Sequence, residues 1–210
     1  MSEWSASHRY GLATAPGGLG LVQDFLNTVG IKDYGPDLLA DPEAAHEWST
    51  GAARTWSALR GVSAEAPPLT DADLPKLRGV RDTITRLVLG ERVDASGLGA
   101  VSASFALSDN QVRLQPAGSG WRWLASILWG EILLSQQTDT WRRLKQCQRH
   151  GCDSTFYDRS KNNSGVWHNV KTCGNAENLR ASRARRRERE RAAEGLSPAP
   201  AAGAAAPGPS

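Results

Sequence analysis

The chain carries all three of its cysteines in two short segments, Cys147-Gln-Arg-His-Gly-Cys152 and Trp167-His168-Asn-Val-Lys-Thr-Cys173. Four residues separate the first two cysteines, and four residues also separate His168 from Cys173. Three thiolates and one imidazole are a donor set that structural zinc sites use, with four protein ligands in a tetrahedron. The spacing therefore predicts one structural Zn²⁺ ion bound by Cys147, Cys152, His168 and Cys173.

Other interpretations of these residues stay open at this point. His150 lies between the first two cysteines and could replace His168 as the fourth ligand; His168 is favoured because it gives two symmetric pairs and follows Trp167. The cysteines could be buried apolar residues, although the neighbours of Cys147 and Cys152 are mostly polar. A disulfide would leave one of three cysteines unpaired, and nothing marks the chain as secreted.

The residues between the two ligand pairs predict a small hairpin. Thr155–Asp158 has strand character, residues 161–165 (Lys-Asn-Asn-Ser-Gly) form turns by composition, and Val166 and Trp167 begin a returning strand. A knuckle, a hairpin and then a helix is the order of a treble-clef finger, in which His168 and Cys173 flank or enter the first helical turn. Residues 141–194 are therefore expected to form a treble-clef zinc finger with a long basic helix.

Basic residues concentrate in this finger. Residues 141–191 carry 14 Lys/Arg and 5 Asp/Glu, whereas residues 1–140 carry 11 and 16. Such a concentration points to a polyanion, most often nucleic acid. The helix expected over about 175–193 carries the arginines predicted to contact it: Arg180, Arg183, Arg186, Arg187 and Arg191. Arginine offers a bidentate fork to phosphate and guanine, but a solvated helix with internal ion pairs would also explain the charge run.

Residues 20–140 are expected to form one α+β domain, mostly helical with a small antiparallel sheet. Apolar residues at helical spacing predict a helix over 21–29, where Asp24 and Asn27 fall off the apolar stripe and are either solvated or a local cap. Asp41 is a candidate N-cap for the next helix, with Pro42 in its first turn. A longer helix is expected over 70–89.

The rest of the chain is expected to hold a hairpin, one more helix and two irregular ends. Alternating residues over 101–123 predict two strands joined by a turn at 118–120 (Gly-Ser-Gly), and helical spacing resumes over 124–137. Residues 1–19 are expected to be a flexible lead-in. Residues 195–210, which apart from Leu196 are only Ala, Pro, Gly and Ser, are expected to be a disordered tail.

Several classes of protein are not expected. The longest apolar stretch, Trp121–Leu134, is interrupted by two charged residues and is shorter than the ~20 residues of a membrane span. No signal-peptide pattern is present, so a cytoplasmic protein without a membrane partner is predicted. Nucleotide-binding, nucleophile-elbow and H-E-x-x-H motifs are absent from the sequence, and a zinc ion with four protein ligands has no open position for a substrate. An enzyme is therefore not expected.

The zinc region resembles the CGNR zinc-finger family. The resemblance rests on Cys147-x4-Cys152, on residues 156–160 (Phe-Tyr-Asp-Arg-Ser) and on residues 167–175, which end in Cys-Gly-Asn. The preceding residues are similar to the ABATE domain that usually precedes this finger, through three short motifs: residues 24–28 (Asp-Phe-Leu-Asn-Thr), 37–39 (Asp-Leu-Leu) and 77–81 (Leu-Arg-x-x-Arg). Together the two resemblances cover about residues 20–190.

This resemblance implies a bacterial protein with an α+β N-terminal domain, a treble-clef finger and a role as a stress-induced transcription regulator. Two positions depart from the family pattern. His168 stands where the family usually has cysteine, which would put an imidazole in place of a thiolate. Ala176 stands where the Cys-Gly-Asn-Arg signature has arginine, so any nucleic-acid contact of that arginine is lost here, and Arg180 or Arg183 are candidates to compensate.

The leading hypothesis is a zinc-dependent DNA-binding transcription regulator whose N-terminal domain senses a small molecule or dimerises. The basic segment and the ligand spacing support it. One alternative is a protein-interaction module, in which the arginine helix docks on an acidic protein surface. Another is an RNA-binding module, in which Tyr157 stacks on bases.

Overall fold

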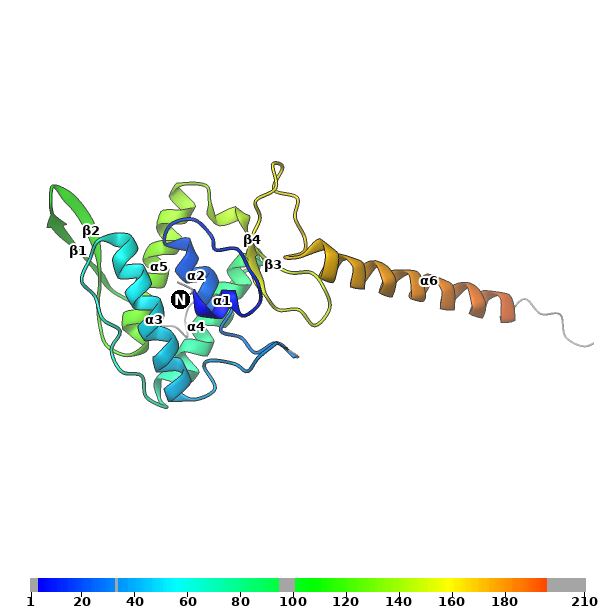
Figure 1. Cartoon of the computed structure of the whole chain (residues 1–210), viewed down its shortest axis with the longest axis horizontal. Helices are drawn as coiled ribbons and strands as arrows, with labels where there is room; N and C mark the ends of the chain where they lie inside the picture. Colours follow the sequence, from blue (N-terminus) through cyan, green and yellow to red (C-terminus); the bar gives the residue numbers. More distant parts are fainter. Residues whose placement is uncertain (1–3, 33, 95–100, 196–210) are drawn as a thin grey trace, which may run out of the picture.

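The computed structural model of the 210-residue chain describes residues 4–32, 34–94 and 101–195 (Figure 1). These residues combine helices with two small antiparallel sheets, the mixed architecture that the sequence predicts. The first part contains α1 (Ser5–His8), α2 (Leu19–Leu26), α3 (Pro42–Arg60), α4 (Asp73–Val88), β1 (Ala103–Ser108), β2 (Gln111–Pro116) and α5 (Trp121–Gln137). The second part contains a 3-10 turn (Trp141–Arg143), β3 (Leu144–Gln146), β4 (Thr155–Tyr157), a π-helical turn (Val170–Gly174) and α6 (Asn175–Gly195).

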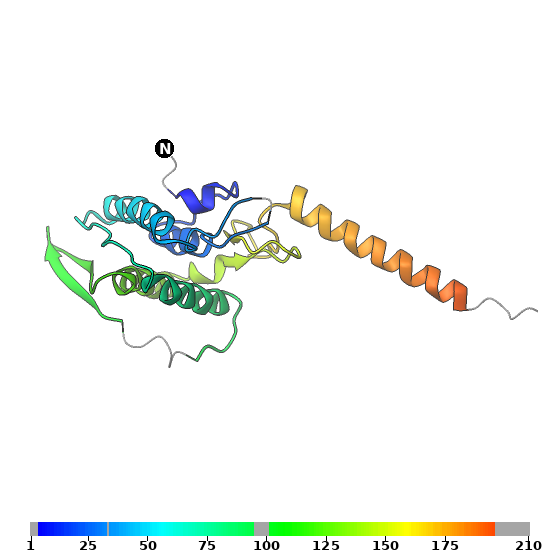
Figure 2. The same ribbon diagram turned by 90° about the horizontal axis from the view of Figure 1, so that it is seen from below.

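Helix α2 lies at the centre of the N-terminal core. All eight of its residues are buried, and it packs against α5 as well as α1, α3 and α4. Seen from below, α2 and α3 form one layer and α4 and α5 the other (Figure 2). Phe25 of α2 and Trp48 of α3 lie with their ring centroids 5.7 Å apart, and each large apolar side chain buried here contributes roughly 1.5 to 3 kcal/mol.

Helix α3 begins where the sequence predicts, and α4 begins three residues later than the expected start at residue 70. Asp41 Oδ1 accepts a hydrogen bond from Ala44 N at 2.9 Å, and Pro42 is the first residue of α3. Pro75 lies in the first turn of α4, where its missing N–H would have had no helical partner. The cap of α3 is thus readable from the sequence because it depends only on neighbouring residues.

The β1–β2 hairpin turns earlier in the chain than its pattern predicts. Its turn is formed by Asp109 and Asn110, which have φ values of 50° and 59°, as a two-residue hairpin turn requires. Both residue types tolerate left-handed backbone because their short polar side chains can bond locally. The expected turn at residues 118–120 instead leads into α5, and the N–H of Trp121 donates to Asp73 Oδ1 at 3.1 Å.

The N-terminal residues are packed rather than flexible. Trp4 and Ala6 are buried, and the N–H of Ser7 donates to Asp24 Oδ1 at 2.7 Å. The guanidinium of Arg9 donates to three carbonyl oxygens of the chain after α2. The expectation of a flexible lead-in over 1–19 is therefore wrong for residues 4–19. Residues 1–3 and residues 196–210 of the expected tail lie outside the described residues.

A second buried network joins α4 to the loop after α2. The guanidinium of Arg81, which is 6% exposed, donates to Asp37 Oδ1 and Oδ2 at 2.8 and 2.6 Å and to Thr28 Oγ1 at 3.0 Å. Burial of Asp37 opposes its ionisation, but the hydrogen bonds from Arg81 outweigh burial and lower the pKa of Asp37. One turn earlier, Arg78 Nη1 donates to Leu39 O at 2.6 Å. The short motifs 24–28, 37–39 and 77–81 thus contact one another as a structural network.

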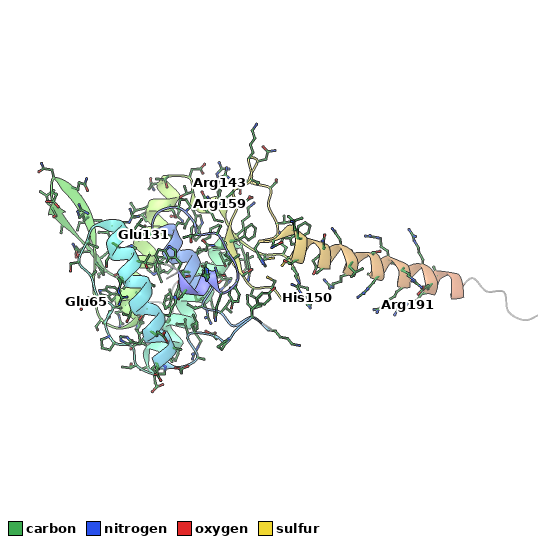
Figure 3. The ribbon with its side chains drawn as sticks, in the orientation of Figure 1. Glu65, Glu131, Arg143, His150, Arg159 and Arg191 are labelled. Atoms are coloured by element: carbon green, nitrogen blue, oxygen red, sulfur yellow. The ribbon has the colours of Figure 1, made fainter. Side chains whose placement is uncertain are left out.

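Glu131 is a buried carboxylate that joins α5 to α3. Its side chain is 1% exposed, and Oε1 accepts hydrogen bonds from Trp56 Nε1 and Arg60 Nε, both at 2.7 Å. Arg60 also pairs with Oε2 through Nη2, and this hydrogen bonding to Glu131 raises the pKa of Arg60. Glu131 lies inside the helical body, whereas Glu65 lies on its rim (Figure 3).

We expect Glu131→Gln to lower the free energy of unfolding by about 2 to 3 kcal/mol. Removing the charge leaves the partly buried Arg60 without its ionic partner. The loss is below the value for a fully buried pair because the side chain of Arg60 is 35% exposed. Urea denaturation followed by tryptophan fluorescence measures the change. The exposed Glu65→Gln is the matched control, with an expected change below about 0.5 kcal/mol. Equal losses in both variants would contradict a special role for this carboxylate.

Candidate metal centre and basic helix

The first ligand pair lies in the loop between β3 and β4, which pair in antiparallel register. Cys147 follows the last residue of β3, and its N–H donates to Ser154 O at 2.9 Å. The N–H of Cys152 donates to Arg149 O at 3.0 Å, and Gly151 has a φ of 74°, a value that glycine adopts without steric cost. These contacts fold the loop into a knuckle that turns both thiols to the same side.

This sheet differs from the predicted hairpin. Strand β4 is close to its expected position, but its partner is β3, which precedes the knuckle, and Val166 and Trp167 are not in a strand. The returning chain contributes one backbone bond here, from Gln148 N to Val166 O at 3.0 Å. The other edge of β4 is already occupied, because Thr155 bonds to the side chain of Asn27 from α2.

The second ligand pair precedes α6. His168 comes just before the π-helical turn, and Cys173 lies inside it. Asn169 Oδ1 accepts a hydrogen bond from Thr172 N at 3.2 Å, and Asn169 O accepts one from Cys173 N at 2.9 Å. The turn continues directly into α6 at Asn175. A bond from a metal ion to Cys173 would therefore also fix the first residues of α6.

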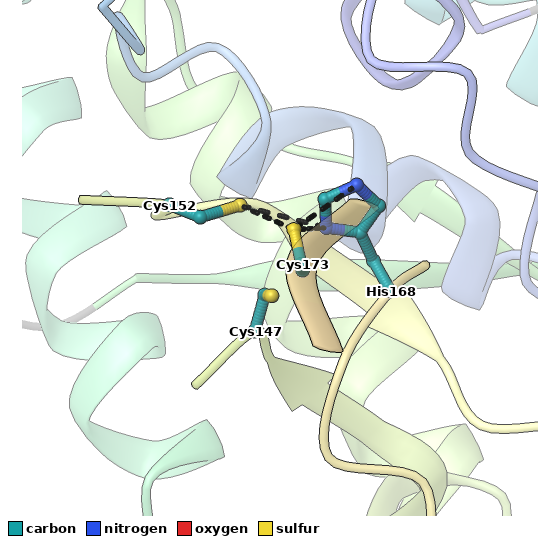
Figure 4. Close-up of side chains that lie close together, drawn as sticks. All are labelled: Cys147, Cys152, His168 and Cys173. Atoms are coloured by element: carbon teal, nitrogen blue, oxygen red, sulfur yellow. Dashed lines mark hydrogen bonds between the residues drawn. The ribbon is translucent and has the colours of Figure 1, made fainter. Parts of the chain in front are cut away.

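The four side chains predicted as ligands converge on one point (Figure 4). A tetrahedral zinc ion at about 2.3 Å from sulfur and about 2.0 Å from nitrogen would separate its ligand atoms by roughly 3.5 to 3.8 Å. Cys173 Sγ lies 3.9 Å from Cys152 Sγ and 3.6 Å from His168 Nδ1, and Cys152 Sγ lies 3.5 Å from that same nitrogen. With Cys147 included, all four ligand atoms lie within 4.8 Å of one another. The cluster is therefore suited to a zinc ion.

The surroundings of the cluster favour a thiolate at Cys152 rather than at Cys147. The thiol of Cys147 donates a hydrogen bond to Cys152, which lowers the pKa of Cys152 and raises that of Cys147. Ser154 Oγ lies 2.9 Å from His168 Nδ1 and 3.2 Å from Cys152 Sγ, so its hydroxyl can support either ligand. Arg149 Nη1 lies 3.9 Å from Cys173 Sγ and offsets the single net negative charge that three thiolates and Zn²⁺ would leave.

His150 lies outside the cluster. Its side chain is exposed, and its N–H donates to Glu177 Oε1 at 2.9 Å, which ties the knuckle to the first turn of α6. Figure 3 places it near the start of that helix, at the surface. Among the described residues, the group that could hold a metal contains His168 and not His150. Metal binding by the four residues remains a prediction that their geometry favours.

A buried carboxylate holds the loop between the two ligand pairs. Asp158 is 3% exposed and accepts hydrogen bonds from Lys145 Nζ and Gly165 N at 2.7 Å and from Ser160 N at 2.8 Å. Burial opposes ionisation of Asp158, but these hydrogen bonds outweigh it and hold its pKa well below the usual range. A Cβ atom at Gly165 would lie 2.8 Å from Asp158 Oδ1, so only glycine permits this close approach.

Helix α6 extends from the Cys/His cluster into solvent (Figures 1 and 2). From Asn178 to Ala192 every residue is exposed. The five arginines predicted to contact nucleic acid all lie on this exposed part: Arg180, Arg183, Arg186, Arg187 and Arg191. Arg180 pairs with Glu177 at 3.3 Å and Arg186 with Glu190 at 2.7 Å. Of the helices in residues 4–32, 34–94 and 101–195, none is both long and apolar enough to cross a membrane.

Sequence reasoning missed three residues that support the cluster. Ser154 contacts two of the predicted ligands, Asp158 orders the loop between them, and Asn27 binds the strand beside them. Asp158 and Asn27 belong to the family motifs, which is the signal that could have found them. Ser154 has no comparable signal, because a serine two residues after a cysteine is common in loops.

Two family models match the chain, in the order expected from its motifs. The CGNR zinc finger matches residues 143–186. The ABATE model, described as "Putative stress-induced transcription regulator", matches residues 19–134. A search of curated proteins found no match. The chain thus belongs to the ABATE family and carries a CGNR zinc finger after its N-terminal domain.

Proposed function

We propose that this protein is a zinc-dependent, DNA-binding transcription regulator in which α6 contacts the phosphate backbone. The two family matches and the Cys/His cluster already support a zinc-binding regulator. The observation that carries the further step to DNA is the exposed basic helix rooted at the cluster: between Asn178 and Ala192 it packs against nothing else among the described residues. The arginines along this part of α6 are therefore accessible to a polyanion.

The dimensions of α6 suit the major groove of DNA. A helix with side chains is about 10 to 12 Å across, and the groove is about 12 Å wide. Arg180, Arg183 and Arg187 share one face with Arg191, while Arg186 lies to one side, so both phosphate walls of a groove are within reach. The two ion pairs on the helix are exposed and contribute little, so exchanging them for phosphate contacts costs under about 1 kcal/mol.

The position of Ala176 supports Arg180 as the replacement for the missing family arginine. Ala176 lies in the first turn of α6, and Arg180 follows it by four residues. Residues four apart lie on the same face of a helix. A guanidinium at position 180 can therefore reach the surface that a side chain at position 176 would cover.

In this proposal zinc has a structural role, and the protein is not an enzyme. Binding by Cys147, Cys152, His168 and Cys173 would complete the tetrahedron and leave no position for a substrate. We propose a treble-clef finger in which the knuckle and the start of α6 carry the two ligand pairs, although β4 pairs with β3 and not with a returning strand. The metal would hold Cys173, and with it the base of α6, against the knuckle.

The N-terminal domain is proposed to dimerise or to sense an effector. Dimerisation is supported by the β1–β2 hairpin, whose apolar side chains Phe105, Leu107 and Val112 are each at least 70% exposed. These three residues lie on one face of the hairpin, as their register shows. Exposed apolar surface of this kind is typical of contact sites between proteins.

Salt titration of binding to a labelled DNA duplex tests the proposal. If the five arginines replace counterions on five phosphates, the log–log slope of affinity against salt should be about −4 to −5. Affinity should then fall roughly 500-fold between 50 and 200 mM NaCl. Fluorescence anisotropy measures it, with single-stranded RNA of equal length as competitor.

The outcome separates the candidate functions. A flat salt dependence, or no binding at 50 mM NaCl, would contradict the DNA proposal. Stronger competition by RNA than by duplex DNA would favour the RNA-binding alternative. Recovery of a protein partner after nuclease treatment, without nucleic acid, would favour the protein-interaction module.

A further inference from the structure

The side chain of Asn27 bonds to β4 in the way that the backbone of a neighbouring strand would. Asn27 Nδ2 donates to Thr155 O at 2.9 Å, and Thr155 N donates to Asn27 Oδ1 at 2.8 Å. One carboxamide thus makes the same two bonds with Thr155 that a neighbouring backbone would make. Asn27 is fully buried and Thr155 nearly so, so neither bond competes with water. This pair of hydrogen bonds, called the clamp below, joins the central helix of the N-terminal domain to the strand that follows the knuckle.

On the finger side, the clamp is close to the cluster. Thr155 follows Ser154, whose hydroxyl contacts His168 Nδ1 and Cys152 Sγ and whose carbonyl accepts the N–H of Cys147. Three of the four predicted ligands therefore contact the residue next to the one that Asn27 holds. A shift of β4 away from Asn27 would move Ser154 and disturb these three contacts.

On the N-terminal side, the clamp continues into the helical core. Asn27 Nδ2 also donates to Ser7 Oγ at 3.1 Å, and Ser7 N donates to Asp24 Oδ1 at 2.7 Å. Asp24 Oδ2 accepts the indole N–H of Trp48 from α3 at 2.8 Å. Ser7, Asp24 and Trp48 are all buried. An unbroken buried chain of hydrogen bonds thus runs from Thr155 to α3.

Other polar contacts across this boundary are weaker or peripheral. Gln23 Nε2 lies 3.4 Å from Thr155 O but is closer to Ala13 O, at 3.1 Å. Arg159 Nη2 donates to Thr14 O in an exposed position. Asn27 makes two buried hydrogen bonds to β4, both of them with Thr155.

We propose that Asn27 is a positioning residue for the metal centre and couples zinc binding by the finger to the stability of the N-terminal domain. The clamp holds β4 and Ser154 where the ligands converge, so its loss raises the free energy of the metal-bound state. By linkage, zinc must stabilise the N-terminal helices by the same amount that an intact clamp strengthens zinc binding. The proposal makes no use of DNA binding and stands or falls separately from it.

Asn27→Asp tests the clamp with almost no change in volume. A carboxylate cannot donate to Thr155 O and would set an oxygen against that carbonyl. We expect the dissociation constant for zinc, measured on the full chain by competition with a chelator, to rise about tenfold. Thr28→Ala is the matched control: it removes a buried hydroxyl from the same loop and the contact with Arg81, but it leaves Thr155 untouched. Its zinc affinity should stay within about twofold.

Hydrogen exchange of the wild-type protein supplies a second readout. Loading with zinc should slow backbone exchange in the α3 segment around Trp48, and Asn27→Asp should abolish that difference. If Asn27→Asp does not fold, the wild-type comparison alone decides. Unchanged exchange in α3 between the metal-loaded and metal-stripped protein would overturn the proposal. So would a folded Asn27→Asp variant that binds zinc as tightly as the wild type, or an equal loss of affinity in Thr28→Ala.

Discussion

Removing the metal, by a strong chelator or by Cys173→Ser, is expected to unfold the finger and to melt most of α6. Structural zinc contributes about 10 to 16 kcal/mol in zinc-finger peptides, which exceeds the stability of most domains. The apolar cluster around the ligands consists of Phe156 and the three cysteines, with Trp167 and Leu12 partly buried beside it. These are too few residues to hold the ligand loops without the metal. In proteins most helical stability comes from tertiary packing, and α6 is exposed from Asn178 to Ala192. Circular dichroism should therefore show a loss of helix on chelation, reversed by adding zinc.

The two histidines provide the matched comparison for this experiment. His168→Ala removes the imidazole whose Nδ1 lies 3.5 Å from Cys152 Sγ, and the purified variant should retain much less than one zinc per chain. His150→Ala should retain one zinc per chain, because its side chain is exposed and outside the cluster. Elemental analysis of both proteins gives the ratio. Metal retention by His168→Ala together with loss in His150→Ala would reverse the assignment of the fourth ligand.

Reversing two charges on α6 is expected to lower DNA affinity by at least about 100-fold at 50 mM NaCl. Arg183→Glu with Arg187→Glu removes two phosphate contacts and adds two repulsive charges on the same face. The slope of affinity against salt should become shallower by about 2, since two fewer counterions are released. Anisotropy with the same duplex measures both quantities, and circular dichroism verifies that the helix is intact.

Arg185→Glu with Arg189→Glu is the control with the same change in net charge. These two arginines lie on the opposite side of α6 from Arg183 and Arg187. Binding through one face predicts a smaller loss for this pair. If both double variants weaken binding equally, the helix attracts DNA through net charge alone, and a defined binding face is ruled out.

Local chemistry explains which parts of the fold the sequence predicts well. The caps at Asp41 and Pro42, the position of α4 and the convergence of the four predicted ligands depend on residue types at short, fixed spacings. The hairpin turn could also have been predicted from local sequence, because Asp109-Asn110 is a strong turn signal. Gly118 and Gly120 gave a stronger turn pattern than these two residues. In the structure, however, Gly120 is the N-cap of α5.

Tertiary contacts explain the rest. Asp24 and Asn27 look like surface residues because they fall off the apolar stripe of α2, yet both are fully buried. Their partners are Ser7, Trp48 and Thr155, between 17 and 128 residues away in sequence, and no local pattern encodes such pairs. The same contacts order residues 4–19 and occupy the edge of β4 that the predicted returning strand would have used.

The rooting of α6 at one end has a consequence for how family members can differ in length. Among the residues that the structure describes, the helix touches the others only through its first turn and the π-helical turn before it (Figures 1 and 2). The direction in which each guanidinium points is therefore set by counting residues from Cys173, at about 100° per residue. One inserted residue before Arg180 would rotate the whole arginine stripe by that angle, whereas a seven-residue insertion would restore its phase to within about 20° and only lengthen the arm.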